Sequence, residues 1–148
     1  MALGEVTANN LGQLRVLHKI LFPVDYDDSF FTNALNAGEL AKLAYYNDVC
    51  VGAVCCRKEV EGEQTKVYMM TLGVLKPYRN AGLGKLLLDH ILEEAKTIQA
   101  KSVYLHVHVK NEDGLAFYKK HGFEVTGEEK DYYRDVEPKD AYILSKTL

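Results

Sequence analysis

A short segment between residues 72 and 85 combines glycines with basic side chains in a spacing that suits the binding of a diphosphate. It reads Leu72-Gly-Val-Leu-Lys-Pro-Tyr-Arg-Asn-Ala-Gly-Leu-Gly-Lys85. Glycines let backbone N–H groups approach a ligand closely, and the start of a following helix adds unpaired donors and a partial positive charge. Arg79 and Lys85 add full positive charges. We therefore expect a pyrophosphate to bind between a strand end and a helix start.

The spacing of these glycines excludes two other phosphate-binding loops. It is not Gly-x-x-x-x-Gly-Lys-Ser/Thr, so a nucleoside triphosphate loop is not supported. It is not Gly-x-Gly-x-x-Gly, which disfavours a dinucleotide site. A glycine-lined turn that begins an ordinary helix remains the structural alternative.

A second candidate for chemistry is the predicted strand 102–109. Its alternation places apolar side chains on one face and Tyr104, His106 and His108 on the other. An imidazole titrates near neutral pH, so His106 suits the role of a general base. The pattern alone also permits a structural histidine whose hydrogen bonds are satisfied.

Tyr68 and Met70 share one face of the predicted strand 67–75. A free phenol has a pKa near 10, so Tyr68 alone is a poor base, and we expect a water relay with His106. The alternative is a core tyrosine.

Two aromatic loop segments are candidates for a binding surface. One is the loop Phe22-Pro23-Val24 with Tyr26, and the other is the pair Tyr132 and Tyr133. Without further information, they are equally readable as aromatics at the edge of the core.

Periodicity and turn signals predict alternating helices and strands in the order βααβββαβαββ. Ser29 is the expected N-cap of the second helix, Gly38 follows its end, and Asn47-Asp48 is the expected turn of a hairpin. This order describes an α/β (α+β) fold with a mixed sheet covered by helices. The expected helices are 11–21, 29–36, 84–100 and 112–121, the strands are 43–46, 49–57, 67–75, 102–109, 123–125 and 142–145, and 58–64 is a loop.

Composition sets the broad class. The 148 residues suit one compact domain, and the formal charge of −3 without a long basic run argues against a nucleic-acid partner. Cys50, Cys55 and Cys56 lie in an apolar run, which indicates reduced core thiols. The apolar stretches are too short to span a membrane and the N-terminus does not resemble a signal peptide, so we expect a cytoplasmic protein, with the nucleus also open.

Two of these segments together resemble the GNAT acetyltransferase superfamily. Arg79-Asn-Ala-Gly-Leu-Gly84 matches its Arg/Gln-x-x-Gly-x-Gly/Ala signature, whose loop binds the pyrophosphate of coenzyme A. Asn111 to Phe123 resembles its second signature, Asn-x-x-Ala-x-x-Phe-Tyr-x-x-x-Gly-Phe. The resemblance implies a GNAT domain over residues 1–148, with a mostly antiparallel sheet of about seven strands and about four helices.

Nearly the whole chain resembles the NatE-type N-terminal acetyltransferases, through segments such as 22–26, 40–48, 51–57, 68–73 and 104–106. This implies acetyl transfer from acetyl-CoA, without a metal, to protein N-termini that keep the initiator methionine before an apolar residue. It also implies association with NatA subunits and the ribosome. The resemblance implies that Tyr68 and His106 are the catalytic pair. The residues that it implies for cofactor binding are Leu72, Gly73, Val74, Arg79, Asn80, Ala81, Gly82, Leu83, Gly84, Lys85, Asn111 and Tyr118, of which Tyr118 would donate a proton to the leaving thiolate. The residues that it implies for the peptide slot are Phe22, Pro23, Val24, Tyr26, Tyr132 and Tyr133, with Met70 at its floor.

Three positions depart from the family pattern. Asn80 replaces a second basic residue, Gly114 replaces a small alanine, and His108 replaces a glutamine. Two rival functions stay open: acetylation of lysine side chains or small amines, and a non-catalytic subunit that keeps the fold only to bind partners.

Overall fold

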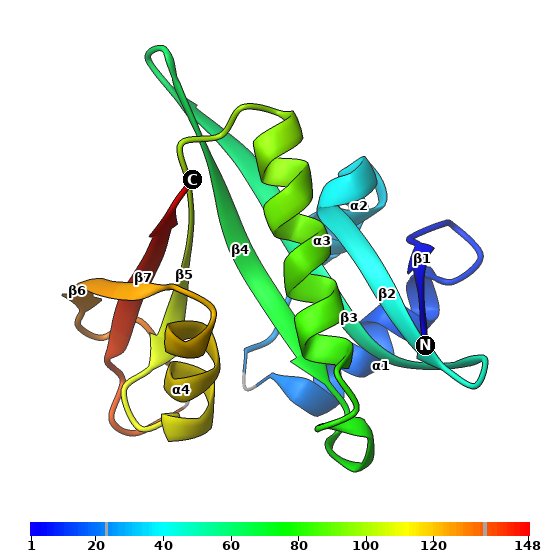
Figure 1. The fold of residues 1–148 in the computed structure, drawn as a ribbon. Coiled ribbons are helices and arrows are strands. Elements are labelled where there is room, and N and C mark those ends of the chain that lie inside the picture. Colours follow the sequence, from blue (N-terminus) through cyan, green and yellow to red (C-terminus); the bar gives the residue numbers. More distant parts are fainter. Residues whose placement is uncertain (23, 135) are drawn as a thin grey trace.

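The computed structural model describes residues 1–22, 24–134 and 136–148 and contains a seven-stranded sheet with helices on both faces (Figure 1). The expected order of helices and strands is confirmed. Two short 3₁₀ turns, Gly38–Leu40 and Lys76–Tyr78, join some of the elements. The elements are β1 (Ala2–Glu5), α1 (Leu11–Leu21), α2 (Asp28–Leu35), β2 (Ala41–Tyr46), β3 (Val49–Glu61), β4 (Gln64–Val74), α3 (Leu83–Thr97), β5 (Ser102–His108), α4 (Glu112–Lys120), β6 (Glu124–Glu129) and β7 (Ala141–Thr147).

The strands lie in the order β1-β2-β3-β4-β5-β7-β6. β4 and β5 are parallel and the other neighbouring pairs are antiparallel, so the expected mixed, mostly antiparallel sheet is confirmed. The parallel pairing covers Lys66–Tyr68 against Ser102–Tyr104, and beyond it the two strands diverge toward the start of α3 (Figure 1). The backbone of Leu72–Val74 therefore lies beyond the last β4–β5 pair, as expected for strand ends that splay.

Each face of the sheet has its own core. α1 and α2 cover one face around Leu14, Leu17 and Phe31. α3 and α4 cover the other, where Leu87, Ile91 and the apolar face of β5 are buried. The polar face of β5, with Tyr104, His106 and His108, is thus on the side of α1 and α2, and it is only partly buried.

The expected loop at 58–64 is wrong, because β3 and β4 continue through it as a hairpin that turns at Gly62. Its charged residues pair across the two strands, as Glu59 does with Lys66 in the register. The hairpin extends past the helices, so its side chains remain exposed and the segment lacks the apolar alternation of a core strand.

Smaller corrections concern the ends of elements. Asp27, not Ser29, is the N-cap of α2, because its carboxylate accepts a hydrogen bond from the Phe30 N–H at 3.0 Å. Gly38 has the expected positive φ, and so do both turn residues of the β2–β3 hairpin, Asn47 and Asp48. The last two strands are longer than expected, because they pair with each other beyond their apolar centres. In the part of the chain that the structure describes, no helix is both long and apolar enough to cross a bilayer.

Candidate active site

Tyr68 and His106 meet on the half-buried face of the sheet. The Tyr68 hydroxyl lies 2.8 Å from the Nδ1 atom of His106. Tyr68 stands at the last parallel pair of β4 with β5, and His106 is two residues further along β5, where the strands begin to separate. The structure thus brings the predicted pair into direct contact, whereas the sequence suggested an intervening water.

Tyr68 lies in a crowded polar environment with little exposure. Its hydroxyl is also 2.9 Å from that of Tyr132, and the Arg57 guanidinium lies 4.9 Å from the centre of its ring. Burial, followed by the hydrogen bond with Tyr132, raises the pKa of Tyr68 well above the ordinary value of a phenol. Tyr68 therefore stays protonated at neutral pH, and it can pass a proton on but cannot persist as a phenolate.

His106 is enclosed between an aromatic ring and a carboxylate. Tyr132 stacks on the imidazole with ring centroids 4.1 Å apart and an interplanar angle of 8°. The Nε2 atom lies 2.5 Å from a carboxylate oxygen of Glu129, at the end of β6. Both ring nitrogens are therefore engaged, which fixes the orientation of the ring.

A β-bulge at Met70 shapes the strand next to Tyr68. Met69 pairs with Cys56 and Thr71 pairs with Cys55, so Met70 is the extra residue on β4. Met70 lines a cavity of about 530 Å³ between α2, β3 and β4, whose wall also contains Phe30 and Arg57. The place of Met70 at the floor of the peptide slot stays a prediction.

The first predicted wall of the slot is supported by a buried histidine that the sequence did not single out. His18 Nε2 lies 2.9 Å from the Thr71 hydroxyl, and Nδ1 donates to the Leu14 carbonyl at 3.0 Å. The rings of Phe22, Tyr26, Phe30 and Phe31 surround it, with centroids 5.0–5.6 Å away. Polar and aromatic contacts thus anchor the α1–α2 connection against β4. Val24 is exposed, and Pro23 lies outside the described residues.

Position 73 lies so close to the side chains of Phe22 and Leu21 that it suits a glycine. A Cβ atom at Gly73 would lie 2.9 Å from the Phe22 ring and 3.0 Å from the Leu21 side chain. Phe22 therefore packs directly on the β4 backbone, in the segment that the sequence assigns to the cofactor arm.

The second predicted wall follows β6. Tyr133 packs against His108 with centroids 5.3 Å apart and against Tyr132 at 4.9 Å. Burial raises the pKa of Tyr26, and the nearby hydroxyls of Tyr132 and Tyr133 add to this rise. That the two aromatic segments, more than a hundred residues apart in sequence, line one peptide slot stays a prediction.

The predicted diphosphate loop has the geometry of an anion site. Gly82 is the N-cap of α3 with φ of 86°, and no side chain caps the helix start. The first backbone bond of α3 runs from the Leu86 N–H to the Gly82 carbonyl, so the preceding N–H groups, among them those of Leu83, Gly84 and Lys85, are left for a ligand. The Asn80-Ala81-Gly82 turn, with positive φ at residues 80 and 82, leads the chain into this geometry. These residues fit the pyrophosphate of a coenzyme A thioester.

The two basic side chains beside this loop also have partners within the protein. Arg79 Nε donates to the Val74 carbonyl at 2.8 Å and so ties the loop to the end of β4. Lys85 forms an ion pair with Asp89 at 2.7 Å, one turn along α3. Arg79 therefore fixes the shape of the loop as well as contributing charge.

Asn111 is the N-cap residue of α4, and Tyr118 lies within that helix. Asn111 caps α4 by accepting from the Gly114 N–H at 2.9 Å, and a Cβ atom at Gly114 would meet the Asn111 side chain at 2.5 Å. The departure at Gly114 thus accommodates the cap. Tyr118 is buried against Phe117 and Phe123, and burial raises its pKa, so its hydroxyl remains a proton donor.

Several residues in and near the site were not singled out from the sequence as site residues: Arg57 and Tyr104, which contact Tyr68, Glu59 beside Tyr104, Glu129 beside His106, and Thr71 beside His18. Tyr104 stacks on Tyr68 at 4.7 Å, and its hydroxyl donates to Glu59. Glu59 and Glu129 stand in exposed, charged segments, and only the register of the strands brings them to the site. Among the described residues, no three His, Cys, Asp or Glu side chains gather as a metal site.

Comparisons with known proteins agree with this geometry. Residues 11–123 match the acetyltransferase (GNAT) family model. The chain is 49% identical to the probable N-acetyltransferase san of Drosophila melanogaster over 99% of this chain and 80% of that protein. It is 48% identical to N-alpha-acetyltransferase 50 of Danio rerio, covering 99% and 88% of the two chains.

A solved structure gives the same result in three dimensions. Naa50 of Arabidopsis thaliana, in complex with the bisubstrate analogue CoA-Ac-MVNAL, superposes with a TM-score of 0.94 at 49% identity, covering 99% of this chain and 98% of that one. With the family model matching most of the sequence, these comparisons leave one assignment: the chain belongs to the GNAT family of acetyltransferases.

Proposed function

We propose that this chain transfers the acetyl group of acetyl-CoA to the N-terminal α-amine of proteins that retain methionine before an apolar residue. The observation that carries the proposal is the hydrogen-bonded pair Tyr68–His106, with the Tyr132 ring stacked on the imidazole. The peptide joined to coenzyme A in the complex of the Arabidopsis relative begins Met-Val, which supports the same substrate class.

The chemistry requires the substrate amine to lose a proton, and this chain's residues can accept it. An N-terminal amine has a pKa of about 8, so a moderate base is sufficient. Tyr68 passes a proton to Nδ1 of His106 while its oxygen receives one from the amine, so the tyrosine is never a free anion. His106 and Tyr68 thus act as one base.

Acetyl-CoA supplies the acetyl group as a thioester. The N–H groups at the start of α3 would hold its pyrophosphate, and the backbone of Leu72–Val74 would hold its arm and polarise the acetyl carbonyl. Tyr118 would donate a proton to the sulfur as the carbon–sulfur bond breaks.

The slot favours an apolar first side chain. Phe22 packs against Tyr26, and Tyr132 packs against Tyr133. These aromatic pairs and Val24 would line the slot, with Met70 at its floor. A flexible thioether packs well on such aromatic rings, at about 0.3–1.5 kcal/mol for each contact. The proposed preference for methionine follows from this lining.

Two rival functions are less well supported. A lysine side chain has a pKa of about 10.4, so it demands a much stronger base than an N-terminal amine. A non-catalytic subunit would not need both an open helix start after Gly82 and a connected Tyr68–His106 pair.

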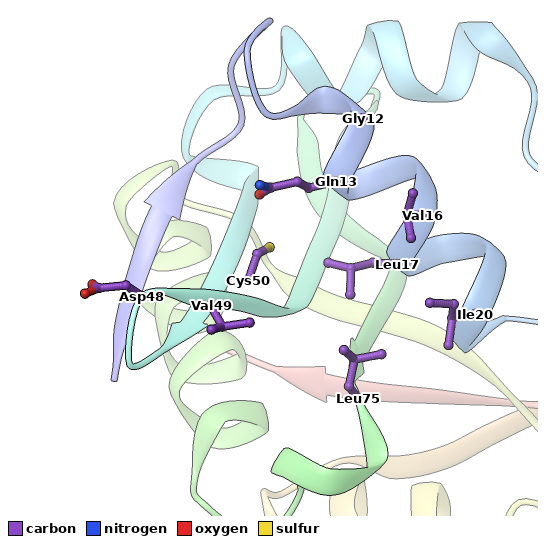
Figure 2. Close-up of a pocket in the computed structure, with 9 residues that line it drawn as sticks. All are labelled: Gly12, Gln13, Val16, Leu17, Ile20, Asp48, Val49, Cys50 and Leu75. Atoms are coloured by element: carbon purple, nitrogen blue, oxygen red, sulfur yellow. The ribbon is translucent and has the colours of Figure 1, made fainter.

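Association with NatA subunits and the ribosome, like residence in the cytoplasm and nucleus, stays a proposal. An apolar groove of about 530 Å³ supports the first (Figure 2). Its walls include Val16, Ile20 and Val49, each more than half exposed, on the outer face of α1 and the β2–β3 turn.

Three peptides test the proposed function when each is mixed with acetyl-CoA and the purified chain. One begins Met-Leu, one begins Ser-Ala, and one is an acetyl-capped Met-Leu peptide with an internal lysine. We expect product from the first at a rate at least tenfold above the others. Product from the capped peptide alone would reject N-terminal acetylation.

A further inference from the structure

Glu129 sets which nitrogen of His106 carries the proton. Its carboxylate oxygen lies 2.5 Å from Nε2, and the imidazole side chain is only 11% exposed. An ionised carboxylate accepts hydrogen bonds and cannot donate them. Nε2 must therefore carry the proton, and Nδ1 is left as the acceptor of the Tyr68 hydroxyl, 2.8 Å away.

This tautomer gives direction to a longer chain of hydrogen bonds. Because Tyr68 donates to His106, the Tyr68 oxygen accepts from the Tyr132 hydroxyl at 2.9 Å. The donors then run in one direction, from Tyr132 through Tyr68 and His106 to Glu129. The opposite tautomer, with the proton on Nδ1, would reverse the hydrogen bonds of Tyr68 and set a bare nitrogen against a carboxylate.

We propose that Glu129 is a positioning residue that holds His106 in the tautomer required for proton transfer and balances the charge that the imidazole gains. This inference rests on the proposed function. When the substrate ammonium gives a proton to the Tyr68 oxygen, the phenolic proton moves to Nδ1 and the ring becomes an imidazolium. The carboxylate then faces a full positive charge, and no bond other than these O–H and N–H bonds changes.

Among the described residues that surround His106, no second carboxylate contacts the ring. Tyr132 covers one ring face, Ile143 of β7 stands opposite His106 in the register, and Arg57 lies over the Tyr68 ring. The neighbouring groups on β5 are occupied: Tyr104 bonds to Glu59, and His108 bonds to the Pro138 carbonyl. Within the described ranges, Glu129 is the carboxylate that contacts the imidazole.

The position of Glu129 also gives the proton an exit. Its side chain is half exposed, whereas His106 and Tyr68 are largely enclosed. Solvent can therefore reach the far side of the carboxylate, and the chain from Tyr68 to Glu129 links the buried reaction site to water. His106 can therefore lose its extra proton to solvent between turnovers while the slot stays closed.

The test compares Glu129→Gln with Glu128→Gln, which removes the same charge from the adjacent, exposed residue of β6. We expect E129Q to lower kcat by about 10- to 100-fold, as is typical when a group that orients a functional imidazole is lost. KM for the Met-Leu peptide and for acetyl-CoA should stay within about twofold. E128Q should have wild-type kinetics.

Nitrogen-15 chemical shifts of the ring give a readout that a merely structural role would not move. Wild-type His106 should show the Nε2–H tautomer, and folded E129Q should show a mixture or the Nδ1–H form. A wild-type ring protonated on Nδ1, or an E129Q kcat within twofold of wild type, overturns the proposal for Glu129. If the wild type acetylates none of the peptides, the proposed function fails, and the nitrogen shifts still decide whether Glu129 sets the tautomer.

Discussion

The Nε2 atom of His18 lies 2.9 Å from the hydroxyl of Thr71, and this buried contact ties α1 to the strand that carries Tyr68. Nδ1 of the same ring donates to a carbonyl of its own helix, so the ring accepts from Thr71. Phe22 and Tyr26, the proposed wall of the peptide slot, pack around this ring. The position of that wall therefore depends on a contact outside the reacting groups.

Replacing Thr71 by valine keeps the shape of the side chain and removes the donor to His18. We expect a loss of about 1–3 kcal/mol in the free energy of unfolding, because a buried acceptor is left unsatisfied. Denaturant unfolding measures this change. The control is Thr65→Val, the same exchange on an outer part of β4. A Thr71→Val protein as stable as the Thr65→Val protein would show that the contact does not hold the wall.

The same histidine predicts how stability depends on pH. Burial lowers the pKa of His18 below 6.5, so below about pH 6.5 the unfolded chain binds a proton that the folded chain does not. The free energy of unfolding should therefore fall as the pH is lowered from 6.5 to 5, and His18→Phe should flatten this slope. The pKa of His121 is also lowered by burial, but that side chain is more exposed, so His121→Asn should flatten the slope less.

Measurements above pH 5 separate the effect of His18 protonation on stability from the effect of carboxylate protonation. The pKa values of Asp27 and Glu39 are held below their ordinary values by hydrogen bonds, from Ser29 and Lys42 respectively. Those groups lose their contribution only at lower pH. Equal slopes in the wild type and His18→Phe between pH 5 and 7.5 would contradict the assignment.

Gly73→Ala tests whether Phe22 forms the wall of the peptide slot. The new methyl group would stand 2.9 Å from the Phe22 ring, so the ring must move. We expect KM for the Met-Leu peptide to rise about tenfold, an increase that corresponds to about 1.4 kcal/mol. Steady-state kinetics at saturating acetyl-CoA measure it. Gly12→Ala in α1, where a Cβ atom meets nothing within 4 Å, should leave KM unchanged.

Gly82→Ala tests the diphosphate site. Its φ of 86° strains any residue with a Cβ atom, at about 1–2 kcal/mol, and relief of that strain would turn the backbone N–H groups away from the ligand. Calorimetric titration should show at least tenfold weaker binding of acetyl-CoA. Gly62→Ala adds a Cβ atom at a comparable φ of 63° in the β3–β4 turn, so it should cost stability and leave affinity intact. Equal affinities in the two variants would remove the loop from the site.

Local signals in the sequence predicted most of the fold. α1 was predicted with its observed ends, because its apolar period is regular and Pro23 follows directly. The β2–β3 turn was predicted from Asn47-Asp48, two residues that tolerate positive φ. The outer part of the β3–β4 hairpin, at residues 58–64, was missed because its stability comes from pairing between strands, which a charged segment does not reveal.

The residues of the candidate site also fall into those that local patterns marked and those that only the tertiary structure revealed. Strand alternation and a loop signature marked Tyr68, His106 and Gly82 as candidates, and the resemblance to the GNAT acetyltransferases supplied their predicted roles. The bulge at Met70, the partner of His18 and the contact of Glu129 with His106 arise from tertiary register, and no local pattern encodes them.

The most direct test of the central claim is the turnover of a Met-Leu peptide by Tyr68→Phe and His106→Gln at saturating acetyl-CoA. Each change should lower kcat by at least about 100-fold, the contribution expected of a positioned acid–base group. Affinity for acetyl-CoA should remain within twofold of wild type. Wild-type turnover in both variants would contradict the account, because the amine would then lose its proton without this pair.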